Sequence, residues 1–182
     1  MGKGSSMVVI RPEKPRDYAG VHEVNRLVFR RESEARLIES LRGSPGFIPE
    51  LSLVAVGGKN VVGHILFIPV SIETPDGEFP ALVMAPMAVR PEQKEDINFK
   101  LMRQGLKECQ RLGHRCVVAI GALEDYTRFG FTPAHRMGLR PSFRIPVGDL
   151  MVLELTPGAL DGVKGTVKFP PVFSELWEVV TL

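Results

Sequence analysis

The sequence of 182 residues has few of the features that mark membrane, secreted or metal-binding proteins. Its two cysteines, Cys109 and Cys116, are spaced neither as a CxxC redox pair nor as a zinc knuckle. The longest apolar stretches, such as 81–89, fall far short of the roughly 20 residues that a spanning helix needs. Residues 1–6 are small and polar and lack the apolar core of a signal peptide. We therefore expect a flexible N-terminus on a cytoplasmic protein, with no metal site and no membrane partner.

Excess charge of either sign is also missing. Lysine and arginine number 23 against 21 aspartate and glutamate residues, a formal net charge of +2. Proteins that hold nucleic acid by bulk charge are far more basic, so we expect no nucleic-acid partner. Hydrophobic residues make up 44% of the chain, which is ordinary for a globular domain. We expect one domain over residues 7–182, which includes a part rich in proline and glycine breaks at 132–182.

The residue patterns present predict a mixed α/β fold. A β-branched run at the start is followed by two helical patterns, the first of which Asp17 is expected to cap. Alternating apolar segments joined by glycine-containing turns then predict an antiparallel meander. The predicted elements are a strand at 7–10, helices from 17 and over 33–42, and strands at 51–56, 61–72 and 79–89.

The second half predicts one crossover between parallel strands. Apolar spacing indicates a helix over 93–112, and a compact apolar run indicates a buried strand at 116–120. Strand, helix and strand in this order form a right-handed crossover, which makes 79–89 and 116–120 parallel neighbours. A helical turn at 125–128 follows, and the remainder contains one predicted strand, at 151–155.

Three groups of residues, in this order along the chain, resemble the GNAT superfamily of acyl-CoA-dependent N-acetyltransferases, and within it the bacterial YhbS-like branch. They are VGHILF at 62–67, APMAVRPE at 85–92, and DYTRFGF at 125–131 with GAL at 158–160 and GTVKFPP at 165–171. The resemblance implies a splayed, mostly antiparallel sheet with one parallel βαβ crossover and flanking helices. It also implies acetyl-CoA as co-substrate.

In that family the cofactor's pantetheine arm enters between the fourth and fifth strands. Pro86 has no N–H and would interrupt a ladder there, which predicts a bulge. The resemblance then implies that backbone groups of Met87, Ala88 and Val89 bind the cofactor's amides and polarise the thioester. The alternative is a plain edge strand with a proline bulge.

The family's glycine-containing pyrophosphate loop is degenerate in this sequence. An ungapped alignment puts Lys94 at the Gln/Arg position and Ile97 and Phe99 at the two positions that are normally small. Their bulk would crowd a phosphate, and the acidic pair at 95 and 96 would repel it. The alternative for this pair is a favourable interaction with the helix dipole in the first turn. The positive charges of Lys94 and Lys100 would offset part of this repulsion.

Tyr126 matches the family position that often protonates the departing thiolate, although it would equally serve as a packed aromatic residue. His64 is a candidate base or a buried structural histidine. Glu73, Asp76 and Glu78 surround a predicted solvated turn. We assign no general base, because a water chain can also remove the amine proton.

These residues predict an N-acetyltransferase that transfers an acetyl group from acetyl-CoA to a primary amine, on a small molecule or a protein, by direct attack. The alternative is a GNAT-like domain that has lost CoA binding and acts as a binding or regulatory module. The apolar tail from 165 to 173 is expected either to cover the domain's own core or to cross to a second subunit in a homodimer.

Overall fold

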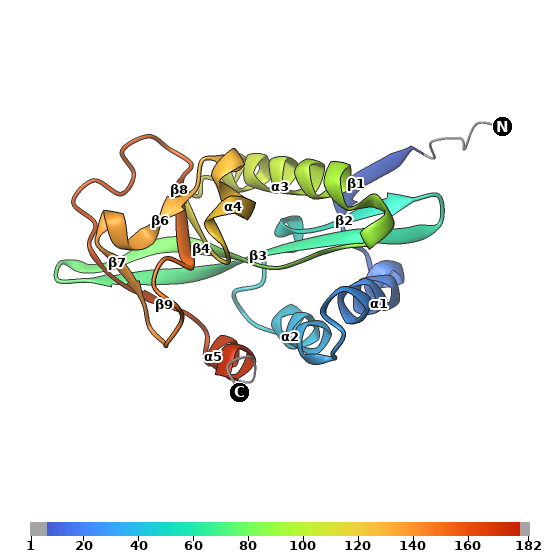
Figure 1. Ribbon diagram of the computed structural model, residues 1–182, viewed down its shortest axis with the longest axis horizontal. Coiled ribbons are helices and arrows are strands. Elements are labelled where there is room, and N and C mark those ends of the chain that lie inside the picture. Colours follow the sequence, from blue (N-terminus) through green and yellow to red (C-terminus); the bar gives the residue numbers. More distant parts are fainter. Residues whose placement is uncertain (1–6, 179–182) are drawn as a thin grey trace. The chain divides into compact units, whose positions relative to one another are not determined.

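The computed structural model describes residues 7–178, apart from the side chains at 94, 95, 177 and 178 (Figure 1). The helices are α1 (Tyr18–Phe29), α2 (Ser33–Arg42), α3 (Lys94–Arg111), α4 (Leu123–Tyr126) and α5 (Pro171–Glu178). The strands are β1 (Val8–Pro12), β2 (Ser52–Gly57), β3 (Asn60–Thr74), β4 (Gly77–Val89), β5 (Cys116–Ile120), β6 (Thr132–Pro133), β7 (Leu139–Pro141), β8 (Leu150–Glu154) and β9 (Gly165–Lys168).

The strands pair in the order β1-β2-β3-β4-β5-β8-β6, and β9 joins β3 to β7. The chain divides into two compact units, 1–66 with 86–105 and 67–85 with 106–182. None of the helices in the described part of the chain is both long and apolar enough to cross a membrane.

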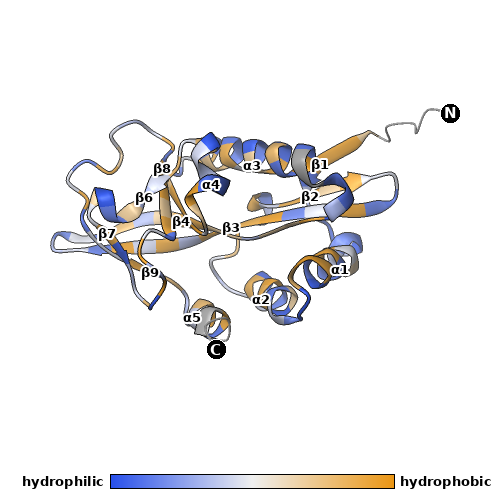
Figure 2. Cartoon of the chain, viewed as in Figure 1, coloured by the Kyte–Doolittle hydropathy of each residue, from blue (hydrophilic) through white to orange (hydrophobic). Residues whose placement is uncertain are grey.

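In the first unit, β1, β2 and the first half of β3 form an antiparallel sheet, with α1 and α2 on one face and α3 on the other (Figure 1). The helices are amphipathic, and Figure 2 shows hydrophobic and hydrophilic residues alternating around the turns of α3. Helix α2 has the predicted bounds. Asp17 does not cap α1, because its carboxylate instead accepts hydrogen bonds from Arg11 (2.6 Å) and from the Lys14 amide (2.7 Å).

A β-bulge lies in β3. Ala55 pairs with Gly63 and Val56 pairs with Val61, so Val62 is an extra residue without a partner on β2. A Cβ on Gly63 would stand 2.9 Å from Leu101 of α3, whereas the side chain of Val61 fills the space beside Gly20 of α1. The bulge therefore turns residues two apart toward opposite faces of the sheet.

The second unit contains the predicted parallel crossover. Leu82, Val83 and Met84 of β4 pair with Val117, Val118 and Ala119 of β5, and β5 pairs on its other side with antiparallel β8. The predicted α/β fold with a mostly antiparallel sheet is confirmed. A short parallel pair of β7 with β9 and the two-residue strand β6 were not predicted, because such short strands have too few residues for an alternating pattern.

The tail packs within its own chain. Phe173 is fully buried, and its ring lies 5.9 Å from that of Phe169, which in turn contacts Phe143 at 5.1 Å. Gly165 at the start of β9 lies so close to β3 that a Cβ there would stand 1.9 Å from the carbonyl oxygen of Glu73. This part of the tail supports intramolecular packing.

Candidate active site

Tyr126 ends helix α4, shortly after β5, and is half-buried. Its ring packs against Phe131 with 5.4 Å between centroids, and its hydroxyl donates to the carbonyl oxygen of Ile120 at 3.4 Å. Both roles considered for this residue therefore fit its surroundings. The ring is a packing element, and the hydroxyl lies at the end of β5 where a weak hydrogen bond leaves the proton available.

Burial raises the pKa of Tyr126 to about 12, and the nearby Asp125 carboxylate adds to the rise. The phenol is consequently protonated throughout the physiological range, which is the state that a general acid requires. The same shift widens the gap to a thiol, whose ordinary pKa is about 8.5. A phenol that holds its proton can donate it and cannot accept the proton of an amine, but the wider gap makes transfer to a thiolate less favourable than from a phenol of ordinary pKa.

The sequence does not identify Gly121 as a site residue, yet its Cα lies directly against the Tyr126 ring. A Cβ on Gly121 would stand 2.6 Å from Cε2 of the tyrosine ring and 3.2 Å from its hydroxyl oxygen. Its amide donates to the carbonyl oxygen of Asp149 at 2.9 Å, which holds the backbone at this point. The only available signal was a glycine directly after a buried strand, which often marks close backbone approach.

Met87, Ala88 and Val89 form the end of β4 and belong to the first unit. Ala88 and Val89 are buried, and Met87 is half-buried. The strand continues through Pro86 to Val89, while its parallel ladder with β5 ends at Met84. The ladder with β5 therefore ends two residues before Pro86, and the bulge expected at the proline stays a prediction.

In the segment aligned with the phosphate loop, the two bulky side chains are not both exposed to a phosphate. Ile97 is only 3% exposed, and it packs in the core where Gly63 allows β3 and α3 to approach. The expectation that Ile97 crowds a bound phosphate is wrong, because its apolar side chain is directed into the core. Phe99 is half-buried.

The charges at the start of α3 are partly balanced. Lys100 forms an ion pair with Asp96 at 2.8 Å, one turn apart on an exposed helix face. The side chains of Lys94 and Glu95 lie outside the described residues. Arg90, just before this segment, binds β3 and α1: its amide donates to the carbonyl of Val62 at 2.9 Å, and its guanidinium contacts Glu23.

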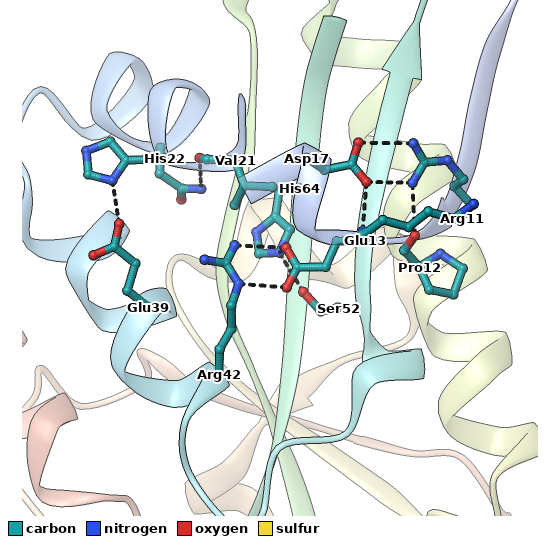
Figure 3. Close-up of polar contacts among 12 residues, drawn as sticks. Arg11, Pro12, Glu13, Asp17, Val21, His22, Glu39, Arg42, Ser52 and His64 are labelled. Atoms are coloured by element: carbon teal, nitrogen blue, oxygen red, sulfur yellow. Dashed lines mark hydrogen bonds and ion pairs between the residues drawn. The ribbon is translucent and has the colours of Figure 1, made fainter. Parts of the chain in front are cut away.

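His64 is a structural residue. It is fully buried on β3, with Nε2 2.9 Å from the Ser52 hydroxyl and 3.9 Å from the Glu13 carboxylate, which Arg42 binds through two nitrogens at 2.9 Å (Figure 3). Burial lowers the pKa of His64 to about 4, and it is partly opposed by the charge of Glu13. A neutral, inaccessible imidazole cannot take a proton from a substrate in solvent.

Glu73, at the end of β3, pairs with Lys168 at 3.4 Å. Asp76 and Glu78 are exposed at the β3–β4 turn, as expected for a solvated turn. Among the candidate residues, Tyr126 thus places a proton donor beside the end of β5, and the three acidic residues of the turn have the solvated surroundings expected of them.

A mostly antiparallel sheet with one parallel crossover is the fold that the resemblance to the GNAT superfamily implies. The chain belongs to this family: the model of the acetyltransferase (GNAT) domain matches residues 9–134. The predicted family and the predicted enzyme class are confirmed.

Proteins from Escherichia coli and Brucella melitensis are similar to most of this chain. The chain is 32% identical over 169 residues to the uncharacterized N-acetyltransferase YhbS of Escherichia coli K12, covering 92% of this chain and 99% of YhbS. The crystal structure of Escherichia coli YhbS in complex with CoA superposes with a TM-score of 0.86 at 28% identity over 95% of each chain. A GNAT-family acetyltransferase from Brucella melitensis, crystallised with acetyl-CoA, gives 0.74 at 29% identity, over 92% of this chain and 99% of that protein.

Proposed function

We propose that residues 7–182 act as one catalytic domain that transfers an acetyl group from acetyl-CoA to a primary amine. Two structural relatives, YhbS and the Brucella protein, were crystallised with CoA and acetyl-CoA respectively. The burial of Ile97 removes one of the two steric objections to binding, and that of the half-buried Phe99 stays. The bound co-substrate supplies an acetyl group on a thioester, so that a C–N bond forms as the C–S bond breaks.

The observation that carries the proposal is Tyr126, whose hydroxyl retains its proton and lies beside the end of β5. In the proposed mechanism its Oη donates that proton to the departing sulfur. Backbone amides of Met87, Ala88 and Val89 bind the amides and the thioester carbonyl of the co-substrate. Lys94 and Lys100 bind its phosphates, with Lys100 shared between the phosphates and Asp96.

The acceptor is a small-molecule or protein amine. A homodimer in which the tail takes part stays a prediction, and the buried Phe173 is equally satisfied within one chain. Because His64 is buried in the core, we assign no general base, and a water chain can remove the amine proton.

Binding is tested by a thermal shift with CoA. A ligand at 100 times its dissociation constant adds about 2.7 kcal/mol of stability, which raises the Tm of a chain this size by roughly 5–10 °C. The absence of any shift at millimolar CoA would contradict the proposal and favour a domain that has lost cofactor binding.

Catalysis is tested with Tyr126→Phe, which keeps the packed ring and removes the proton. The expected result is a fall in kcat of about 100-fold or more, with the KM for acetyl-CoA unchanged. If kcat is unchanged in this variant, the general acid lies elsewhere.

A further inference from the structure

An open cavity of about 560 Å³ lies in the second unit, on the part of the sheet that β3, β9 and β7 form (Figure 1). Thr166 of β9 pairs with Glu73 of β3 on one side and with Arg140 of β7 on the other. Directly paired residues point to the same face of a sheet, so these three side chains stand in a row. Their neighbours Ile72 and Val167 are buried on the opposite face. The cavity is therefore on the polar face of these strands.

Two positively charged side chains of the cavity wall start close together. The stem of Lys164 lies over Gly138, because a Cβ on that glycine would stand 2.8 Å from Cγ and 3.1 Å from Cδ of the lysine. Gly138 also has a φ of +75°, which other residues adopt only under strain. Arg140 follows two residues later, so its Cα lies within about 7 Å of that of Gly138. A single anion between the two side chains can contact both.

These two cations have no negative partner in the described part of the chain. Arg140 and Lys164 are exposed, and neither forms an ion pair with a described side chain. Glu73 also lines the cavity, but its carboxylate binds Lys168 at 3.4 Å. Two like charges this close repel each other, and an anion that binds both removes the repulsion. The hydroxyl of Thr166, in the same row, is a further hydrogen-bond donor.

We propose that this cavity binds a dianionic phosphate group, either free or carried by a small molecule. The planar guanidinium of Arg140 contacts two phosphate oxygens, and the Lys164 ammonium contacts the group as a point charge. The Thr166 hydroxyl donates to a remaining oxygen. Two cations beside one binding position favour two negative charges on one centre over a single charge. The site has no residue in common with the proposed acetyl transfer and is independent of it.

The first test titrates the full chain with inorganic phosphate in low salt at about pH 8, where phosphate is largely a dianion. Saturable changes in the NMR signals of the amides of Gly138 and Thr166 are expected. Dimethyl phosphate, which has a similar shape and one charge, should bind at least about tenfold more weakly. The absence of a saturable change, or equal affinity for the two anions, would overturn the inference.

Phenyl phosphate separates the two sources of the phosphate group. Tighter binding of phenyl phosphate than of inorganic phosphate would assign the cavity to a phosphorylated small molecule. Weaker binding would assign it to free phosphate. The titrations need no acetyl-CoA, so their result does not depend on whether the proposed reaction takes place.

The second test removes one positive charge at a time. Lys164→Met keeps the stem over Gly138 and removes the charge, and Arg140→Gln removes the other charge. Each is expected to raise the Kd for phosphate at least about tenfold. Lys107→Gln is the matched control, because Lys107 is an exposed cation of the second unit outside the cavity wall, and its Kd should equal that of the wild type. Wild-type affinity in both cavity variants, or an equal loss in the control, would overturn the inference.

A change in the opposite direction is expected at the carboxylate of the wall. Glu73→Gln removes a negative charge from the cavity and releases Lys168 from its ion pair, so the Kd for phosphate should fall about fivefold. Tighter binding cannot result from a loss of folding. A Kd that rises or stays the same in Glu73→Gln would count against phosphate in this cavity.

Discussion

Replacing Gly121 by alanine should displace Tyr126 without touching its chemistry. The added Cβ would lie 2.6 Å from the ring atom Cε2, and ordinary contact begins at 3.4 Å. The ring must therefore move by about 0.8 Å, and a displacement near 1 Å in a catalytic group costs up to about 100-fold in rate. We expect kcat to fall about 30- to 100-fold, with the KM for acetyl-CoA nearly unchanged.

A double-mutant cycle distinguishes displacement of the ring from a change in the backbone. In a Tyr126→Ala background no ring meets the new methyl group, so Gly121→Ala should cost little further kcat. Gly43→Ala is the matched control: Gly43 follows α2 in a right-handed conformation, with φ −84°, and its nearest neighbour atom is 3.7 Å from the new Cβ. Steady-state kinetics on the wild type, the two single variants, the double variant and this control suffice. Wild-type kcat in Gly121→Ala, or the same loss in both backgrounds, would refute the reasoning.

Three further predictions concern the first unit. Ile97→Ala should lower the free energy of unfolding by about 2–5 kcal/mol in denaturant titration, because it leaves a cavity in the core. A change below about 0.5 kcal/mol would contradict the burial of the Ile97 side chain. Asp96→Asn should release Lys100 from its ion pair and remove the repulsion between Asp96 and a bound phosphate, which amounts to about 1 kcal/mol at contact. The KM for acetyl-CoA should therefore fall about fivefold. An unchanged KM would show that the phosphates do not bind beside Asp96. The pKa of His64 is lowered from 6.5 to about 4 in the folded protein, so the unfolded chain binds a proton more readily than the folded one. The stability that follows from this difference, about 3 kcal/mol, is fully present above pH 6.5 and is lost as the pH falls toward 4. His64→Gln should flatten the stability profile between pH 6.5 and 4, and an unaltered slope would contradict the assignment.

The main elements of the fold could be predicted from the sequence because their patterns are long. Helix α2 and strand β5 have the bounds that their apolar spacing indicated. The parallel pairing of β4 with β5 follows from the crossover through α3 that joins these two strands. The short strands β6, β7 and β9 could not be predicted, since two to four residues carry no period.

The candidate site was only partly predictable. Tyr126 was found through a resemblance, whereas Gly121 contributes by having no side chain and leaves no chemical signal in the sequence. Ile97 was misinterpreted because an ungapped alignment fixes a position along the chain and not the direction of a side chain. Helical geometry in the first turn of α3 sends Ile97 inward and leaves Asp96 outside, next to Lys100.

The bulge at Val62 has a consequence for how this chain tolerates changes in length. Deletion of Val62 would leave Val61 and Gly63 facing the same opposite sides of the sheet, so the register of β2 and β3 would survive the loss of one residue. What would be lost is the carbonyl that accepts the amide of Arg90. The carbonyl of the extra residue therefore holds the chain in place where it leaves β4.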